Sequence, residues 1–103
     1  MRFKYTLPDN LVKKVVQLDE FANGGHQVTI RLKNGRVYHS VLISNSMWII
    51  AIRGYSDLPF SLSEIEDIFQ TESDKNSVER GGWDFWDEWA RETLGKRGYG
   101  KET

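Results

Sequence analysis

The segment VTIRLKNGRVYHSVLIS, residues 28–44, constrains the fold more than any other part of the chain. In its first half, apolar and polar residues alternate, which is typical of a β-strand with one buried face. Asn34 and Gly35 follow, and this pair is a strong signal for a tight turn because both residue types tolerate positive φ angles. A second run of β-branched and aromatic residues begins at Val37. We therefore predict a β-hairpin whose turn lies at Asn34-Gly35.

The type of turn determines which side chains of the second strand face the core. A strict two-residue turn would pair Leu32 with Val37 and bury the odd-numbered positions 37, 39 and 41. A type I turn closed by a glycine bulge shifts the register by one residue and buries positions 38, 40 and 42 instead. We predict the bulged turn, because it buries Tyr38 and leaves His39 in solvent.

The segments on both sides of the hairpin carry helix and strand patterns. A short alternating strand at the N-terminus leads to a helix that starts at Pro8 and continues, at helical spacing of its apolar residues, towards Gly24-Gly25. After the hairpin, residues 47–54 predict a strongly apolar third strand. Pro59 favours a short edge-type strand, and one helical turn at 61–66 leads into a final strand. Five strands in so short a stretch predict a strongly bent sheet or barrel.

The C-terminal third begins with a polar segment and continues with a segment whose apolar residues have helical spacing. Residues 71–82 are polar and end in glycines, which is typical of a linker or an ordered loop. Residues 83–95 predict a second helix, with Trp83 and Trp86 on its apolar stripe. We therefore predict the α+β class, a small five-stranded antiparallel bent sheet or barrel with an N-terminal and a C-terminal helix. The single domain 1–103 divides into a strand and helix (1–24), a small β-barrel (27–70), a linker (71–82) and a helix (83–95).

Composition restricts the class of protein. The chain has 103 residues, 39% hydrophobic and 28% charged, which fits one globular domain. It contains no cysteine, and this excludes disulfides, thiolate catalysis and zinc sites with sulfur ligands. No stretch has the pattern of a signal peptide or the length of a membrane-spanning helix, so we expect a cytoplasmic protein that does not bind membranes.

The polar side chains form no recognisable catalytic or metal-binding pattern. His26 and His39 lack carboxylates at metal-ligand spacing, and the serines lack a nucleophile-elbow motif. The acidic residues of segment 64–67 are interpreted as a solvated surface rather than as catalytic carboxylates. We therefore predict no enzymatic activity, no cofactor and no metal.

Basic residues gather around the tip of the predicted hairpin. Arg31, Lys33 and Arg36 lie close to Tyr38, and single-stranded nucleic acid is bound by such combinations of cations and aromatic rings. Charged residues also protect exposed hairpins from pairing with other strands. The net charge of −1 and the pI of about 6.1 favour this second interpretation, because dedicated nucleic-acid binders are usually basic.

The predicted C-terminal helix has more aromatic surface than one buried face needs. Trp83 and Trp86 are interpreted as core residues, whereas Phe85 and Trp89 extend the apolar stripe and are assigned equally to core and interface. Acidic residues lie on the opposite side of this helix. The predicted partner-binding residues are Asp84, Phe85, Asp87, Glu88, Trp89 and Glu92.

The segment VTIRLKNGRVYHSVL resembles the first motif of Sm-like proteins, in which a Leu-x-Asn/Asp-Gly turn is followed by an aromatic residue, a small residue and a leucine. Here the aromatic residue is Tyr38, and Ser40 stands where the family usually has glycine. Ile52-Arg53-Gly54 is similar to the start of the family's second motif but follows the third strand directly. The resemblance implies a small barrel that assembles into a ring and binds RNA through the hairpin face.

Two functional hypotheses follow from these patterns. The first is a non-catalytic protein-binding module, an inhibitor or immunity-type protein whose acidic, tryptophan-bearing end neutralises a basic toxin or nuclease. The alternative is an Sm-like RNA-binding module that contacts RNA through Arg31, Lys33, Arg36 and Tyr38.

Overall fold

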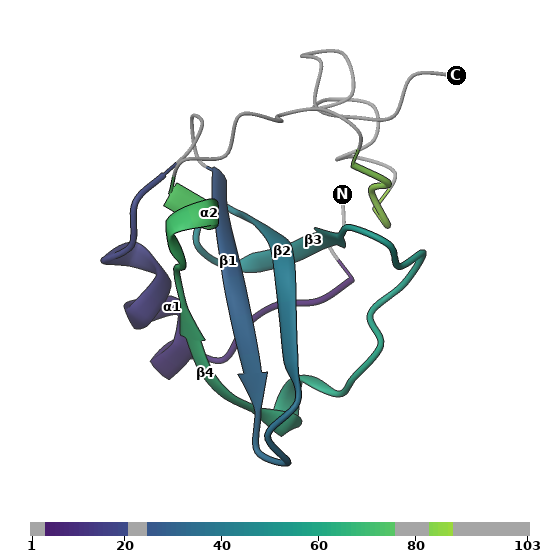
Figure 1. The fold of residues 1–103 in the computed structure, drawn as a ribbon, viewed down its shortest axis with the longest axis horizontal. Helices are drawn as coiled ribbons and strands as arrows, with labels where there is room; N and C mark the ends of the chain where they lie inside the picture. Colours follow the sequence, from purple (N-terminus) through teal and green to yellow (C-terminus); the bar gives the residue numbers. More distant parts are fainter. Residues whose placement is uncertain (1–3, 21–24, 76–82, 88–103) are drawn as a thin grey trace.

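A computed structural model describes residues 4–20, 25–75 and 83–87 of the chain. Within these ranges the elements follow one another along the chain (Figure 1) as α1 (Asp9–Val16), β1 (Gly25–Leu32), β2 (Val37–Ser44), β3 (Trp48–Ile52), the short 3₁₀ helix η1 (Leu62–Glu64), β4 (Ile65–Phe69) and α2 (Glu72–Lys75). The strands form an antiparallel sheet in the order β3-β2-β1-β4. None of the helices in the described part is long and apolar enough to cross a membrane.

The hairpin turn confirms the predicted glycine bulge. The Gly35 amide donates to the Leu32 carbonyl (2.9 Å), and the Leu32 amide donates to the Arg36 carbonyl (2.8 Å). Gly35 has φ +92°, a conformation that costs glycine little and other residues more. Asn34 adds a side-chain contact, because its Oδ1 accepts the Arg36 amide at 2.9 Å. As expected for this register, Tyr38 is buried and Val37 is exposed.

A second bulge, which the sequence analysis does not predict, changes the register further along β2. Val28 pairs with Val41 and Ile30 with Tyr38, so Thr29 faces the two residues His39 and Ser40. Ser40 adopts φ +56° to make room for the extra residue. Beyond this point the odd positions face the inner core, and the prediction that Leu42 lies there is wrong. Leu42 is buried on the outer face of the sheet instead.

The described residues form an open sheet of four strands, not a five-stranded barrel. The strand predicted around Pro59 does not form, and the neighbouring Leu58 and Phe60 pack partly buried against the inner core. The predicted N-terminal strand reduces to one bridge between Thr6 and Trp48 on the outer edge of β3. No strand therefore links the two edges of the sheet within the part that the structure describes.

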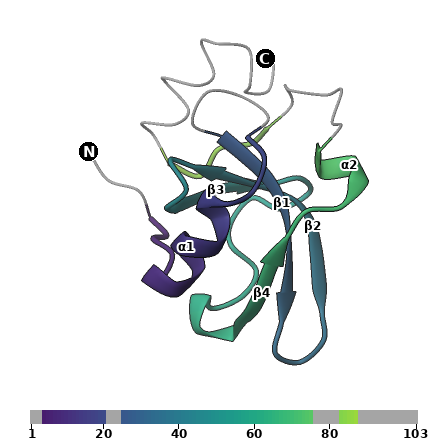
Figure 2. The same cartoon turned by 90° about the vertical axis from the view of Figure 1, so that its left-hand side faces the viewer.

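Helix α1 is shorter than the sequence pattern predicts: it ends at Val16 and does not continue to Gly24-Gly25. It packs along β4 (Figure 2), with Leu11 and Val15 buried in the inner core. The residues after the helix form hydrogen bonds with the segment that follows β4. Asp19 makes two backbone hydrogen bonds with the side-chain amide of Gln70, of 2.9 and 2.7 Å.

The prediction of a helix from residue 83 is wrong for Trp83–Asp87, which the structure describes as non-helical. In β3, Leu42 pairs with Ala51 and Ile43 with Ile49, which leaves Ile50 as an extra residue. The Ile50 carbonyl accepts the Trp86 amide at 3.1 Å, so this segment runs beside β3. The remainder of the predicted helix, residues 88–95, lies outside the described residues.

Aromatic side chains of this segment go to both sides of the sheet. Trp86 enters the inner core, which α1 covers. Trp83 and Phe85 pack on the outer face, over Leu42 and Ile50. The sheet is therefore covered on both faces at this end, and this explains why β3 is buried throughout apart from Trp48.

Within the segment predicted to be a linker or an ordered loop, residues 72–75 form the short helix α2. Thr71 and Asp74 form reciprocal hydrogen bonds at the start of α2, in the manner of a capping box. α2 covers part of the outer face beside β1 (Figure 1), far from the hairpin tip. Residues 76–82 lie outside the described ranges.

Candidate functional site

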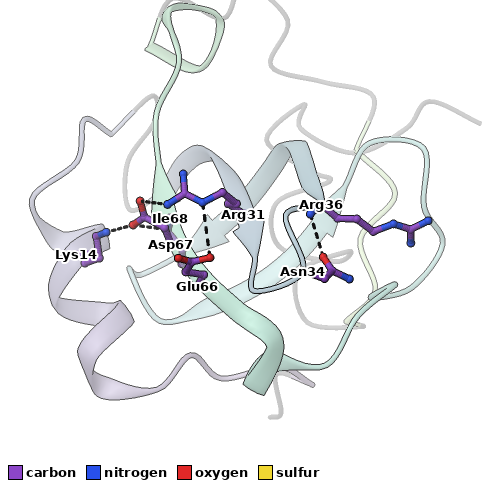
Figure 3. A network of polar contacts seen from close by, with 7 residues as sticks. All are labelled: Lys14, Arg31, Asn34, Arg36, Glu66, Asp67 and Ile68. Carbon is purple, nitrogen blue, oxygen red and sulfur yellow. Dashed lines mark hydrogen bonds and ion pairs between the residues drawn. The ribbon is translucent and has the colours of Figure 1, made fainter.

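Arg31, which the RNA-binding alternative needs as a free cation, forms ion pairs within the protein. Arg31 lies between two carboxylates of β4 (Figure 3), with Nε 3.9 Å from Glu66 Oε1 and Nη2 3.5 Å from Asp67 Oδ2. Its guanidinium also lies over the ring of Phe69, 5.8 Å from the centroid. Lys14 of α1 forms a further ion pair with Asp67. Acidic partners therefore balance the charge of Arg31.

The other predicted RNA-contacting residues are separated by the fold. Lys33 and Arg36 are exposed at the tip, and the side chain of Arg36 extends away from the ion-pair network in Figure 3. Tyr38 points to the opposite side of the hairpin and is 9% exposed. Its ring packs against Tyr55 and Phe60, with centroids 5.6 and 5.0 Å apart. The structure thus does not bring the four residues together on one accessible surface.

The predicted partner-binding residues of the C-terminal segment have different environments. Asp84 is exposed, whereas Phe85 and Asp87 are each 2% exposed. Asp87 uses Oδ1 to accept the backbone amide of Lys4 at 2.7 Å. Of the two roles considered for Phe85, core and interface, its burial supports the core. Glu88, Trp89 and Glu92 lie outside the described residues.

The structure brings together an aromatic and acidic group of residues that the sequence analysis does not single out. Tyr5 is at the centre of this group: its ring contacts Trp86 and its hydroxyl binds Asp57, while Trp86 binds the backbone of Tyr55. The rings of Tyr5 and Trp86 meet edge to face, with centroids 5.6 Å apart. Trp86 Nε1 donates to the Tyr55 carbonyl at 3.1 Å, and Tyr5 Oη donates to Asp57 Oδ1 at 2.6 Å. We call Tyr55 and Asp57, the exposed members of this group, the Tyr55–Asp57 patch.

The hydrogen bond between Tyr5 and Asp57 shifts the pKa of both side chains. The hydrogen bond from Tyr5 lowers the pKa of Asp57, and the bond from the Leu58 amide lowers it further. The same bond to Asp57, together with burial, raises the pKa of Tyr5 to about 12. Asp57 is therefore charged and Tyr5 is neutral throughout the physiological pH range.

A buried polar network lies on the outer face, under α2. Asp74 is 2% exposed, and its carboxylate accepts four hydrogen bonds from Gln27 Nε2, Thr29 Oγ1, Thr71 N and Thr71 Oγ1. The Thr29 hydroxyl also lies 3.1 Å from Nδ1 of His39. Because the single hydroxyl proton goes to Asp74, His39 must be the donor in that contact. The arrangement can hold α2 on the sheet, but Thr29 is fully buried and cannot serve as a nucleophile.

His26 is the second histidine, and it is buried on the inner face of β1. It pairs with Ile43 across the sheet, and its Nδ1 has no hydrogen-bond partner in the described part of the structure. Burial lowers the pKa of His26, while Glu20, a hydrogen bond to the Leu18 backbone and Asp19 partly oppose this effect. The folded protein therefore holds this imidazole neutral.

The His26 environment predicts a loss of stability in mild acid. Below a pH of about 6.5 the unfolded chain binds a proton at His26 that the folded protein does not, so the free energy of unfolding should fall as the pH decreases from 7 to 5. Urea unfolding at several pH values measures this slope. His26→Leu should reduce the slope, because it removes the imidazole that burial keeps neutral. An equal slope in wild type and His26→Leu would contradict the assignment.

Among the described residues, no group of three or more His, Cys, Asp or Glu side chains could hold a metal ion. Comparison of the chain with protein-family models, with curated proteins and with solved structures finds no match in any of the three.

Proposed function

We propose that the chain is a non-catalytic protein-binding module, an inhibitor or immunity-type protein that neutralises a basic toxin or nuclease. The observation that supports this proposal is that the described hairpin does not bring an accessible cation and an accessible aromatic ring together, as RNA binding would need. The charge of Arg31 is balanced by Glu66 and Asp67, and Tyr38 is inside the core. Tyr55 is 43% exposed and lies two residues along the chain from Asp57, whose lowered pKa keeps that side chain negatively charged.

An acidic and aromatic surface suits a basic protein better than it suits RNA. Phosphate groups would be repelled by Asp57, whereas lysine and arginine side chains of a protein would be attracted. Tyrosine is enriched at protein interfaces because its ring supplies contact area and its hydroxyl a hydrogen bond. This surface differs from the predicted one, since Tyr55 and Asp57 take the place of Phe85 and Asp87.

Affinity capture with the full chain tests the proposal. The expected result is one protein recovered in a fixed ratio to the chain, with its recovery unchanged after ribonuclease treatment. The recovered protein should form the same complex when both partners are purified. Recovery of RNA alone, or of protein that disappears after ribonuclease treatment, would contradict the proposal.

Direct titration with single-stranded RNA tests the alternative. We expect a dissociation constant no tighter than the non-specific range of about 10⁻⁴–10⁻⁶ M at physiological salt. The double variant Lys33→Ala, Arg36→Ala removes both exposed tip cations and should change this value little. A submicromolar, salt-sensitive complex that this variant abolishes would favour the Sm-like function instead.

A further inference from the structure

We propose that the Tyr55–Asp57 patch is a preorganised receptor for an arginine side chain of a basic protein partner, with Asp57 binding the guanidinium and Tyr55 stacking against it. This inference rests on the proposed protein-binding function and names the chemical group that the partner would insert.

The carboxylate of Asp57 is fixed before any partner arrives. Both of its hydrogen bonds go to one oxygen, Oδ1, which accepts Tyr5 Oη at 2.6 Å and the Leu58 amide at 2.8 Å. Oδ2 accepts no hydrogen bond from the described residues, and Asp57 is exposed. A partner's donor can therefore bind Oδ2 without displacing an existing contact. Because the side chain already has its orientation, binding costs little further conformational entropy.

The backbone of Tyr55 makes two hydrogen bonds. Its amide donates to the Ile52 carbonyl at 3.1 Å, and its carbonyl accepts Trp86 Nε1 at 3.1 Å. On one side the ring contacts Tyr38 edge to face, yet 43% of the residue remains exposed. A partly exposed ring, two residues along the chain from a carboxylate that is already oriented, suits a cation that can stack and donate hydrogen bonds together.

Arginine meets these requirements better than lysine. Its planar guanidinium can lie on an aromatic ring and still direct N–H groups at a carboxylate, whereas the ammonium of lysine is a strongly hydrated point charge. Among the described residues, Lys4 lies near enough to Asp57 for its charge to contribute to the lowered pKa of that carboxyl group. The Lys4 side chain should compete with the partner's arginine for this carboxylate.

The test uses defined peptides and the ¹⁵N-labelled full chain. One peptide contains two arginines separated by glycines, and a matched peptide contains lysines in their place. We expect the arginine peptide to perturb the amide signals of Tyr55, Asp57 and Leu58 most strongly, and to bind more tightly than the lysine peptide. Asp57→Asn keeps an oxygen acceptor for Tyr5, so the fold should survive, but it should weaken arginine-peptide binding about threefold. Tyr55→Ala should weaken it by a similar factor.

Two further variants make the test specific. Asp9→Asn removes the same charge at an exposed site on α1 and should leave peptide binding unchanged. Lys4→Gln should strengthen binding, because it removes the competing cation. Equal affinity for the two peptides, or equal losses in Asp57→Asn and Asp9→Asn, would overturn the inference. A captured protein that binds Asp57→Asn and Tyr55→Ala as tightly as wild type would also overturn it while leaving the proposed function intact.

Discussion

Replacing Trp86 with alanine should lower the free energy of unfolding by about 3–5 kcal/mol, the usual cost of removing a large aromatic side chain from a core. Trp86 is 4% exposed and belongs to the inner core. Its ring meets Tyr5 edge to face, and its Nε1 donates to the Tyr55 carbonyl. The alanine variant would leave a cavity there and an unpaired carbonyl beside it. Urea unfolding followed by tryptophan fluorescence and far-UV circular dichroism measures the change.

Trp86→Phe is the matched control for this substitution. Phenylalanine keeps an aromatic ring in the core but has no N–H group for the Tyr55 carbonyl, so it should cost much less than alanine. The difference between the two variants separates packing from hydrogen bonding. An alanine variant with wild-type stability would show that Trp86 does not occupy the core.

Asp74→Ala should cost about 3 kcal/mol of stability, although the sequence predicts only a linker or an ordered loop for this segment. The substitution removes the acceptor of four hydrogen bonds. The side-chain amide of Gln27, buried on β1, would lose its acceptor among the described residues, and the buried Thr29 hydroxyl would keep only its contact with His39. The free energy of unfolding is again the measurement, and Ser73→Ala, at an exposed neighbouring position, is the control.

A rescue experiment distinguishes lost hydrogen bonding from general damage to α2. When both partners of a buried hydrogen bond become apolar, the cost is much smaller than when one is left unpaired. The double variant Asp74→Leu, Thr29→Val should therefore be more stable than Asp74→Leu alone. If the double variant were less stable, the polar network would not be the reason why Asp74 matters.

The hairpin turn could be predicted from the sequence because its determinants are local. Asn34 and Gly35 supply the side-chain acceptor and the positive φ that a bulged type I turn needs. The bulge at Ser40 has no such signal, since serine carries no marker for a left-handed conformation. The register is therefore correct near the turn and shifted by one residue beyond the bulge.

The C-terminal segment shows how tertiary contacts can override a helical pattern. Trp83 and Trp86 are three residues apart and fit one helix face, but Trp83 and Phe85 equally fit one side of an extended chain. The extended form is favoured because the carbonyl of Ile50, at the β3 bulge, accepts a hydrogen bond from the Trp86 amide. The Tyr55–Asp57 patch escapes sequence analysis for a related reason. Tyr5, which orients Asp57, is 52 positions away along the chain.

Each pair of neighbouring strands in the described sheet contains a bulge, with Ser40, Glu66 and Ile50 at or beside the irregular positions. Each bulge bends its strand and increases the local twist, so the sheet is not flat. The backbone of Tyr5 and Leu7 also occupies the outer edge of β3, and Asp67 Oδ1 accepts the Ile68 amide on β4. Amyloid growth needs long, flat strands with free edges, and this sheet therefore makes a poor template for it.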